Sequence, residues 1–315
     1  MASILTNASA MTALQTLSVT NKNLAVTQNR IATGMKVAEA ADNAAYWSIA
    51  TTMRSDNKAN EVITSSLGLG GAKVDTAYTA IKDVVSVVDQ IKQKVLSAKN
   101  ASADDQGKIQ TEIKALQAQL GESTKASYAG SNLLSTDATK DAGATAVPNF
   151  SIVSSYNRDS AGNVTTGSID VVLKDIRLID TQATPPATGP TGILDTEFSV
   201  DAATPATMGS ILDLDVTSAT NADIDLMLKG IETAAGKLAS GAATLGAAKT
   251  RVDLQSAFIT ALSDAIDRGI GSMVDADMNK ESARLSALQV QQQLGVQALS
   301  IANSSNQNIL SLFRG

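Results

Sequence analysis

Two stretches of the chain, lying far apart in the sequence, carry an apolar residue at every seventh position. A strict seven-residue repeat lines these side chains along one stripe of an α-helix and favours helices packed in a left-handed supercoil. We therefore expect a mainly α fold with long antiparallel coiled-coil helices from both termini. The expected coiled-coil core consists of Val74, Ile81, Val88, Val95, Ile231, Leu238, Leu245, Val252, Ile259 and Ile266.

The second stretch keeps its spacing from Ile224 to Met273. A continuous helix of that length would be about 75 Å long at 1.5 Å per residue. Small residues alongside it would allow a neighbouring helix to approach closely, namely Ala234, Gly241 and Ala248. Such a small-residue seam could permit two nearly equal packings.

The first stretch contains the glycine-rich run Leu67–Gly71, where we expect the helix to loosen or break. A polar turn at residues 100–106 follows it. The apolar residues between Ile109 and Leu120 then indicate a shorter amphipathic helix.

All five prolines fall between Pro148 and Pro205. Because proline breaks helices, the chain divides into two helical arms and a non-helical middle. Alternating patterns predict strands over Phe150–Tyr156 and Ile169–Ile179, joined by a hairpin turn at Asn157–Asn163. We expect residues 137–221 to form a small β-rich inserted domain.

Residues 1–21 and 285–313 contain no charged residue, although 18% of the whole chain is charged. Such ends suit burial against other protein, where an unpaired charge would be costly. Neither has the apolar run of about 20 residues that spans a bilayer. We expect residues 1–40 and 285–315 to be disordered or loosely helical in the monomer and to order on assembly, with subunit packing through Leu14, Leu17, Leu24, Ile31, Leu288, Leu294, Leu299 and Leu310.

The composition excludes several classes of function. The chain has no histidine and no cysteine, so the commonest general base and the usual zinc ligands are missing. Its net charge of −6 disfavours nucleic acid or an anionic membrane as a partner. Residues 1–21 lack the features of a cleavable signal peptide, which leaves a dedicated export route open.

Three local motifs are better explained by packing than by chemistry. Gly230–Leu238 resembles a phosphate loop but has the wrong glycine spacing and ends in Leu instead of Ser or Thr. Asp275, Asp277 and Asn279 open like a calcium loop, but Lys280 replaces its glycine, so they indicate a helix boundary. Trp47 beside Tyr46 is typical of an aromatic anchor in a helix interface. We expect no metal or cofactor.

The two arms resemble bacterial flagellin. The resemblance rests on Thr6–Leu17 and Asn29–Ala45 at one end, and on Asp275–Glu281, Gln289–Leu294 and Gln307–Leu312 at the other. It extends over about the first 135 and the last 90 residues, and the middle block has no counterpart, as is usual for the variable region of this family.

The resemblance implies a non-enzymatic subunit of the extracellular flagellar filament, an open helical polymer of this chain alone or with related flagellins. It further implies secretion through the flagellar type III channel and contacts with an export chaperone, a cap and junction proteins, without membrane insertion. Residues 1–40 and 285–315 would form the inner tube. Residues 41–136 and 222–284 would form a coiled-coil shell, and residues 137–221 would face water.

Two departures from the family concern host immune receptors. Ala41-Asp42-Asn43 stands where flagellins read by plant receptors usually have Lys-Asp-Asp. Gln90, beside Lys92, stands where the animal Toll-like receptor usually meets an arginine. We therefore expect recognition by both receptors to be weak.

Three other functions stay open on the sequence alone. A hook–filament junction protein shares the terminal pattern but would not normally form long filaments by itself. An enzyme could occupy the middle block, although that block has only about 85 residues and lacks histidine and cysteine. A role as adhesin or signalling ligand would be secondary.

Overall fold

The computed structural model describes residues 7–138, 149–159, 161–181, 191–204 and 207–312, with no side chains described at 149 and 305–312. Residues 1–58 together with 263–315 form one compact unit, called here the terminal unit. Residues 59–262 form the other, called the shell unit. Within the described ranges, no helix combines the length and apolar character needed to cross a membrane.

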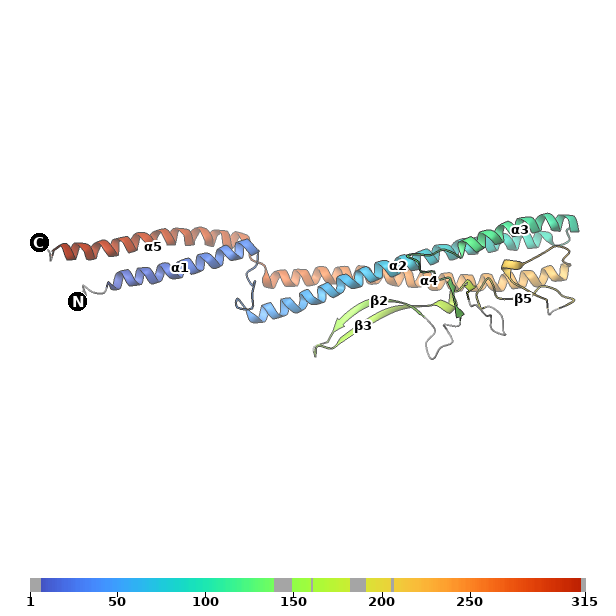
Figure 1. Ribbon diagram of the computed structural model, residues 1–315, viewed down its shortest axis with the longest axis horizontal. Coiled ribbons are helices and arrows are strands. Elements are labelled where there is room, and N and C mark those ends of the chain that lie inside the picture. The colour runs from blue at the N-terminus through green and yellow to red at the C-terminus, as the bar shows by residue number, and fades with distance from the viewer. Residues whose placement is uncertain (1–6, 139–148, 160, 182–190, 205–206, 313–315) are drawn as a thin grey trace. The chain divides into compact units, whose positions relative to one another are not determined.

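The shell unit is built on the parts that it contains of two long helices, α2 (Ala44–Ala98) and α4 (Asn221–Val274), which run side by side there in Figure 1. Ion pairs between Asp75 and Lys249 and between Lys99 and Asp225 show that the helices are antiparallel. The expected continuous second helix is confirmed, and at 54 residues it is about 81 Å long. The repeat residues Val74, Ile81, Val88, Val95, Ile231, Leu238, Leu245, Val252 and Ile259 are all buried in one core.

The expected loosening or break at Leu67–Gly71 is wrong, because α2 continues through it without interruption. Gly70 instead makes room for the middle of the chain. A Cβ built at this glycine would lie 2.7 Å from the side chain of Ile152. The glycine therefore serves close packing, and the helix accepts its cost of about 1 kcal/mol in helix propensity.

Gly241, one of the small residues of α4, has the neighbouring helix α2 beside it, as expected, and a segment of the insert as well. A Cβ at Gly241 would lie 3.1 Å from the carbonyl oxygen of Asp175 and 3.6 Å from Cδ1 of Ile81. Ala234 and Ala248 are buried as well. Gly241 is enclosed by the chain's own insert and by α2, and a seam with two packings at this point stays a prediction.

The shorter helix α3 (Ala103–Ser123) begins earlier than the apolar pattern indicated. The hydroxyl of Ser102 accepts a hydrogen bond from the Asp105 N–H at 3.3 Å and caps its first turn. Asn100, in a left-handed conformation with φ of 63°, lies in the turn after α2. The predicted polar turn is thus present but shorter.

The middle of the chain is strand-containing, as expected, and is laid against the helices of the shell unit. The hairpin strands β2 (Asn149–Arg158) and β3 (Val164–Val172) pair antiparallel, with a register shift between Val153 and Ser155. Short strands complete it: β1 (Ser135–Thr136) pairs parallel with β4 (Ile179–Asp180), and β5 (Phe198–Ser199) pairs antiparallel with β6 (Met208–Gly209).

The predicted second strand over Ile169–Ile179 is misplaced. β3 begins at Val164 and ends at Val172, and a 3-10 turn follows at Leu173–Asp175. Ile176 and Leu178 are fully buried, but in non-strand backbone. The apolar run therefore predicts buried residues correctly, but it predicts a strand correctly only as far as Val172.

The terminal unit pairs α1 (Ala8–Thr33) with α5 (Met278–Leu312). α1 ends at Gly34, whose φ of 71° is the left-handed geometry that glycine adopts without strain. The chain then bonds to the α4–α5 connection, since the Lys36 N–H donates to the Val274 carbonyl and the Ala276 N–H to that of Gly34. A small core of Val37, Ala50, Ile270 and Val274 lies here, and the half-buried Ile266 packs against it.

Candidate functional site

The inner faces of α1 and α5 pack along a row of mainly leucine, isoleucine and threonine side chains, called here the seam. Leu17, Leu24, Ile31 and Leu299 are half-buried, and Leu288 is buried. Thr20 and Thr27 are the buried residues of α1, and a Cβ at Gly295 would lie 3.3 Å from Leu17. The seam is thin and partly polar, so it buries little apolar surface for its length.

Polar contacts run along the same seam and show that α1 and α5 are antiparallel. The Asn7 side chain donates to the Ala302 carbonyl at 3.0 Å, and Gln292 donates to Asn21 at 2.8 Å. At the far end Arg30 pairs with Glu281 at 3.4 Å.

The outer faces of the two helices are apolar and exposed. On α1, Leu14 is 56% exposed, and Met11, Val19 and Val26 are exposed as well. On α5, Val290, Leu294 (57% exposed) and Ile301 (69% exposed) follow one stripe, since they are spaced four and seven residues apart. We call Val290, Leu294 and Ile301 the outer stripe.

The predicted packing residues thus divide between two faces. Leu17, Leu24, Ile31, Leu288 and Leu299 are half-buried or buried, whereas Leu14 and Leu294 are exposed. The side chain of Leu310 lies outside the described residues. An α-helix that is apolar on two opposite faces can bury one within the chain and the other against a second protein.

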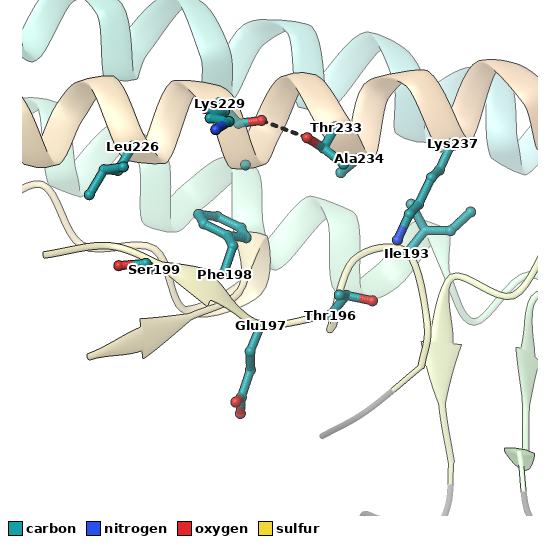
Figure 2. A pocket seen from close by; sticks show the side chains of 11 residues that line it. Ile193, Thr196, Glu197, Phe198, Ser199, Leu226, Lys229, Thr233, Ala234 and Lys237 are labelled. Carbon is teal, nitrogen blue, oxygen red and sulfur yellow. Dashed lines mark hydrogen bonds between the residues drawn. The ribbon is translucent and has the colours of Figure 1, made fainter. Parts of the chain in front are cut away.

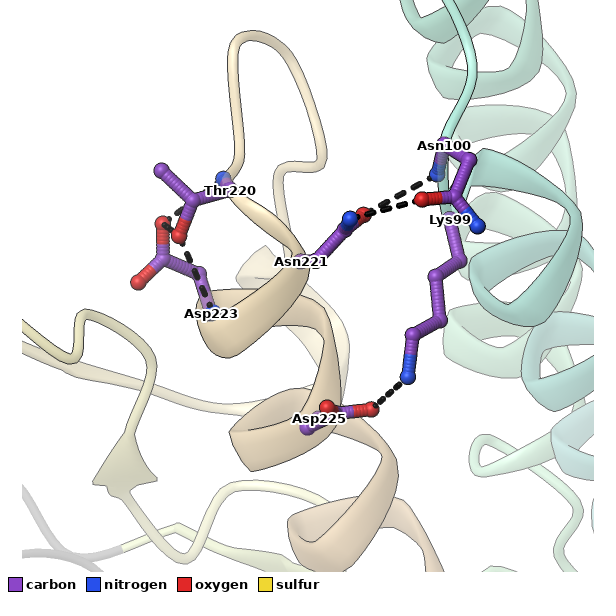
Figure 3. Close-up of polar contacts among 6 residues, drawn as sticks. All are labelled: Lys99, Asn100, Thr220, Asn221, Asp223 and Asp225. Carbon is purple, nitrogen blue, oxygen red and sulfur yellow. Dashed lines mark hydrogen bonds and ion pairs between the residues drawn. The ribbon is translucent and has the colours of Figure 1, made fainter.

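Figure 3 shows the end of the helical hairpin in the shell unit. Asn100 and Asn221 bond to each other twice: the Asn100 N–H donates to Asn221 at 3.0 Å, and the Asn221 side chain donates to Asn100 at 2.7 Å. Lys99 pairs with Asp225 at 2.5 Å. These contacts fix the axial alignment of α2 against α4 at this end of the hairpin.

α4 begins with a reciprocal cap. The Asp223 N–H donates to the Thr220 hydroxyl at 3.3 Å, and the Thr220 N–H donates to the Asp223 carboxylate at 2.8 Å. The Thr220 hydroxyl and the Ala202 N–H, both bonded to Asp223, lower the pKa of this carboxyl. The cap therefore also ties the insert to the start of α4.

Three glutamines of α3 hold the segment that returns to α4, and the sequence reasoning missed them. Gln110 is buried, donates to the Leu214 carbonyl at 3.0 Å and accepts from the Val216 N–H at 2.9 Å. Gln106 donates to the Ala219 carbonyl, and Gln117 to that of Leu214. Their spacing on the apolar stripe of α3, in line with Ile113 and Leu120, was the available signal.

A cavity of about 310 Å³ lies between α4 and the β5 segment (Figure 2). The Phe198 ring packs on Gly230, where an added Cβ would lie 2.3 Å from the ring. Thr233 donates to the Lys229 carbonyl within α4, and Lys237 reaches down beside Ile193. Gly230–Leu238 is helical throughout, so its backbone N–H groups serve the helix and cannot cradle a phosphate.

The acidic motif at residues 275–279 lies at a helix boundary, as predicted. The Asp277 carboxylate accepts from the N–H groups of Asn279 and Lys280, at 3.0 and 3.2 Å, and so caps α5. Among the residues that the structure describes, no group of His, Cys, Asp or Glu is arranged to hold a metal ion.

Comparison with known proteins agrees with this geometry. The bacterial flagellin N-terminal helical region matches residues 4–139, and the bacterial flagellin C-terminal helical region matches residues 228–313. The flagellin of Brucella melitensis is 52% identical over the full length of both chains. The chain belongs to the bacterial flagellin family.

Other flagellins extend the similarity. Flagellin C of Rhizobium meliloti is 43% identical, again over the full length of both chains. Among solved structures, Bacillus cereus flagellin matches 64% of this chain and 87% of its own, with 18% identity and a TM-score of 0.34.

The receptor-facing candidates of this flagellin have structural contacts of their own. Asp42 accepts from the N–H groups of Glu39 and Ala38, which lowers the pKa of its carboxyl. Asn43 accepts from the Tyr46 N–H in the first turn of α2. Gln90 is exposed, and Lys92 is ion-paired with Glu232, which raises the pKa of the lysine.

Tyr46 and Trp47, predicted as a possible interface anchor, are partly exposed at 47% and 37%. More than a third of each side chain is left uncovered by the described residues, and a helix-interface role for the pair stays a prediction.

Proposed function

We propose that this flagellin polymerises into the helical flagellar filament through the outer faces of α1 and α5. The observation that carries the proposal is the outer stripe: three large apolar residues exposed on a helix with no charge between residues 285 and 313. Burying such a surface against another copy desolvates no charge. At about 1.5–3 kcal/mol per side chain, the stripe would contribute roughly 5 kcal/mol before the entropic cost of association.

The contact is heterologous, because the outer stripe of one copy meets a different surface of the next. A heterologous contact that does not close into a ring generates an open helical polymer. The role is structural and not catalytic, which agrees with a chain that lacks both histidine and cysteine.

We assign the parts of the filament as follows. Residues 1–40 and 285–315 form the inner tube, and residues 41–136 and 222–284 form the coiled-coil shell. Residues 137–221 face the solvent. The assignment is supported by the charge-free ends and by the long buried repeat between α2 and α4.

The partners follow from the same proposal. The subunit leaves the cell unfolded through the flagellar type III channel, escorted by an export chaperone, and is added under a cap beyond the junction proteins. It polymerises alone or with related flagellins in the extracellular filament.

Seeded elongation tests the proposal. The purified chain is incubated with filament seeds and imaged by electron microscopy, and we expect long filaments. Leu294→Lys and Ile301→Lys should each stop elongation, because a charge would be buried at the contact, and circular dichroism should show unchanged helix content. The control is Val164→Lys, which alters an equally exposed valine of the β2–β3 hairpin and should elongate normally.

Two results would contradict it. Normal elongation by both lysine variants would remove the outer stripe from the contact. Failure of the unmutated chain to elongate would favour the hook–filament junction alternative.

Recognition by host receptors is proposed to be weak. Asn43 carries no charge where the plant-type motif has an aspartate, and Gln90 cannot supply the cation of an arginine. Purified monomer in plant and Toll-like receptor reporter assays should give a response at least about tenfold below that of a flagellin with the charged residues, equivalent to about 1.4 kcal/mol of lost binding. Gln90→Arg should raise the animal response, and a strong response of the unmutated chain would contradict this proposal.

A further inference from the structure

One ion pair, between Arg30 and Glu281, faces into the otherwise uncharged seam between α1 and α5. α1 contains Lys22 and Arg30, and the described part of α5 contains Lys280, Glu281 and Arg284. Lys22, Lys280 and Arg284 are exposed, whereas the side chains of Arg30 and Glu281 are only 28% and 9% exposed. Arg30 and Glu281 are therefore the ionisable groups that the two helices direct at each other.

The contact is poorly made for a stabilising ion pair. It has one hydrogen bond, at 3.4 Å, where a good arginine–carboxylate pair has two and is shorter. Arg30 Nε and Glu281 Oε2 are buried without a hydrogen-bond partner among the described residues. An ion pair that leaves donors and acceptors without partners gains too little interaction energy to offset the cost of its desolvation.

Thr27 adds to this cluster one turn before Arg30. Thr12, Thr16, Thr20 and Thr33 each donate their hydroxyl to the carbonyl four residues earlier. The hydroxyl of Thr27 is fully buried and makes no such bond in the described structure. The cluster of Thr27, Arg30 and Glu281 is thus polar, buried and only partly satisfied.

Beyond the Asn7–Ala302 and Asn21–Gln292 hydrogen bonds and the Leu17–Gly295 contact, the seam says little about register. Its apolar contacts are leucines and isoleucines at helical spacing, so a slide of one turn would replace one such contact by another. A slide of α5 in one direction would bring Arg284 opposite Arg30, and like charges would meet in a buried site. A slide of one turn in the other direction would bring Arg30 opposite Met278, the first residue of α5, and away from the Glu281 carboxylate.

We propose that the Arg30–Glu281 pair, with Thr27, determines the register in which α1 and α5 pair. The pair is a positioning contact: it selects one alignment of two helices that would otherwise slide. A buried polar group that fixes helix register at a cost in stability is a well-attested use of such groups. The inference deepens the proposed function, because the register decides which outer residues of α1 and α5 are presented together to the next copy.

Disulfide trapping in the full-length chain tests it, since the chain has no cysteine of its own. Asn21→Cys with Gln292→Cys reports the observed register, because these side chains are hydrogen-bonded. Asn21→Cys with Val296→Cys reports a slide of one turn. The ratio of the two disulfide yields is measured in seeded filaments. Where no filament forms it is measured in the soluble chain, in which the disulfide traps α1 and α5 whenever they pair.

In the parent background we expect the observed register to be trapped at least about tenfold more than the shifted one, which corresponds to about 1.4 kcal/mol. Glu281→Gln, which keeps the shape of the side chain, should lower the ratio at least about fivefold, by leaving Arg30 buried without a counter-charge. The exchanged pair Arg30→Glu/Glu281→Arg should restore it. Arg284→Gln, a change in an exposed residue one turn away, should leave the ratio within about twofold.

An unchanged ratio in Glu281→Gln, or no disulfide in the observed register in either state, overturns the inference. Failure to elongate, with the ratio in the soluble chain responding as described, would instead count against the proposed function and leave the register role in place.

Discussion

At the scale of single residues, two neighbouring glycines of α2 have opposite surroundings. A Cβ at Gly70 would lie 2.7 Å from three carbon atoms of Ile152, whereas a Cβ at Gly68 would meet nothing within 4 Å. Gly68→Ala should stabilise the fold by about 1 kcal/mol through helix propensity. Gly70→Ala should lose that gain to overpacking, which costs about 1–3 kcal/mol.

Urea unfolding of the two alanine variants measures this difference, with the unmutated chain as reference. Combining Gly70→Ala with Ile152→Ala should show coupling, since the second change removes the atoms that the new methyl group meets. Equal stabilities of the Gly68 and Gly70 variants would mean that β2 does not press on α2 at this point.

The same contrast shows which residue roles could be predicted. The buried repeat positions, from Val74 to Ile259, follow from periodicity alone because a helix turns its seventh residues to one side. The role of Gly70 does not, because it depends on Ile152, which is 82 positions away and on a strand. The role of Gly241 does not follow from periodicity either, because it depends on the Asp175 carbonyl of the insert.

At the scale of elements, α3 is held by buried amides as much as by apolar contact. Gln110→Leu should destabilise the shell unit by about 2–4 kcal/mol, because the Leu214 carbonyl loses one of its two partners and the Val216 N–H is left buried and unpaired. Gln119→Leu alters an exposed glutamine of the same helix and should change the free energy of unfolding by less than about 0.5 kcal/mol. Thermal or urea unfolding of both variants measures the difference. An unchanged free energy of unfolding in Gln110→Leu would show that these hydrogen bonds make no net contribution to stability.

Helices were predicted better than strands. α4 and α3 follow from long apolar stripes, and their caps at Thr220 and Ser102 follow ordinary helix-start chemistry. The predicted start of β3, at Ile169, is five residues later than the observed start at Val164. The apolar residues of Ile169–Ile179 belong to two structures, the end of a strand at Val172 and a turn that buries Ile176 and Leu178. Period-two patterns cannot separate a strand from a buried turn that follows it.

At the scale of the whole molecule, the chain divides where no sequence signal exists. The sequence boundaries of the two compact units fall between Lys58 and Ala59 and between Leu262 and Ser263, within the residue ranges of helices α2 and α4. A change of composition marks the charge-free ends and the proline-rich middle, but a helix that crosses from one unit to the other carries its periodicity through the border.

The two units should also differ in how their order depends on assembly. The core of the shell unit is continuous from Ile63 to Ile259, whereas the α1–α5 seam is thin and the outer faces of both helices are exposed. Hydrogen exchange should therefore find amides of residues 8–33 and 285–312 nearly unprotected in the monomer, and amides of residues 74–95 and 231–252 strongly protected. In the filament the terminal amides should gain at least about a hundredfold in protection, or about 2.7 kcal/mol, as the outer stripe is buried. Residues 74–95 serve as the internal control, because their protection should change little on assembly. Terminal helices that are already as protected in the monomer as this control would show that the ends fold without a neighbouring copy.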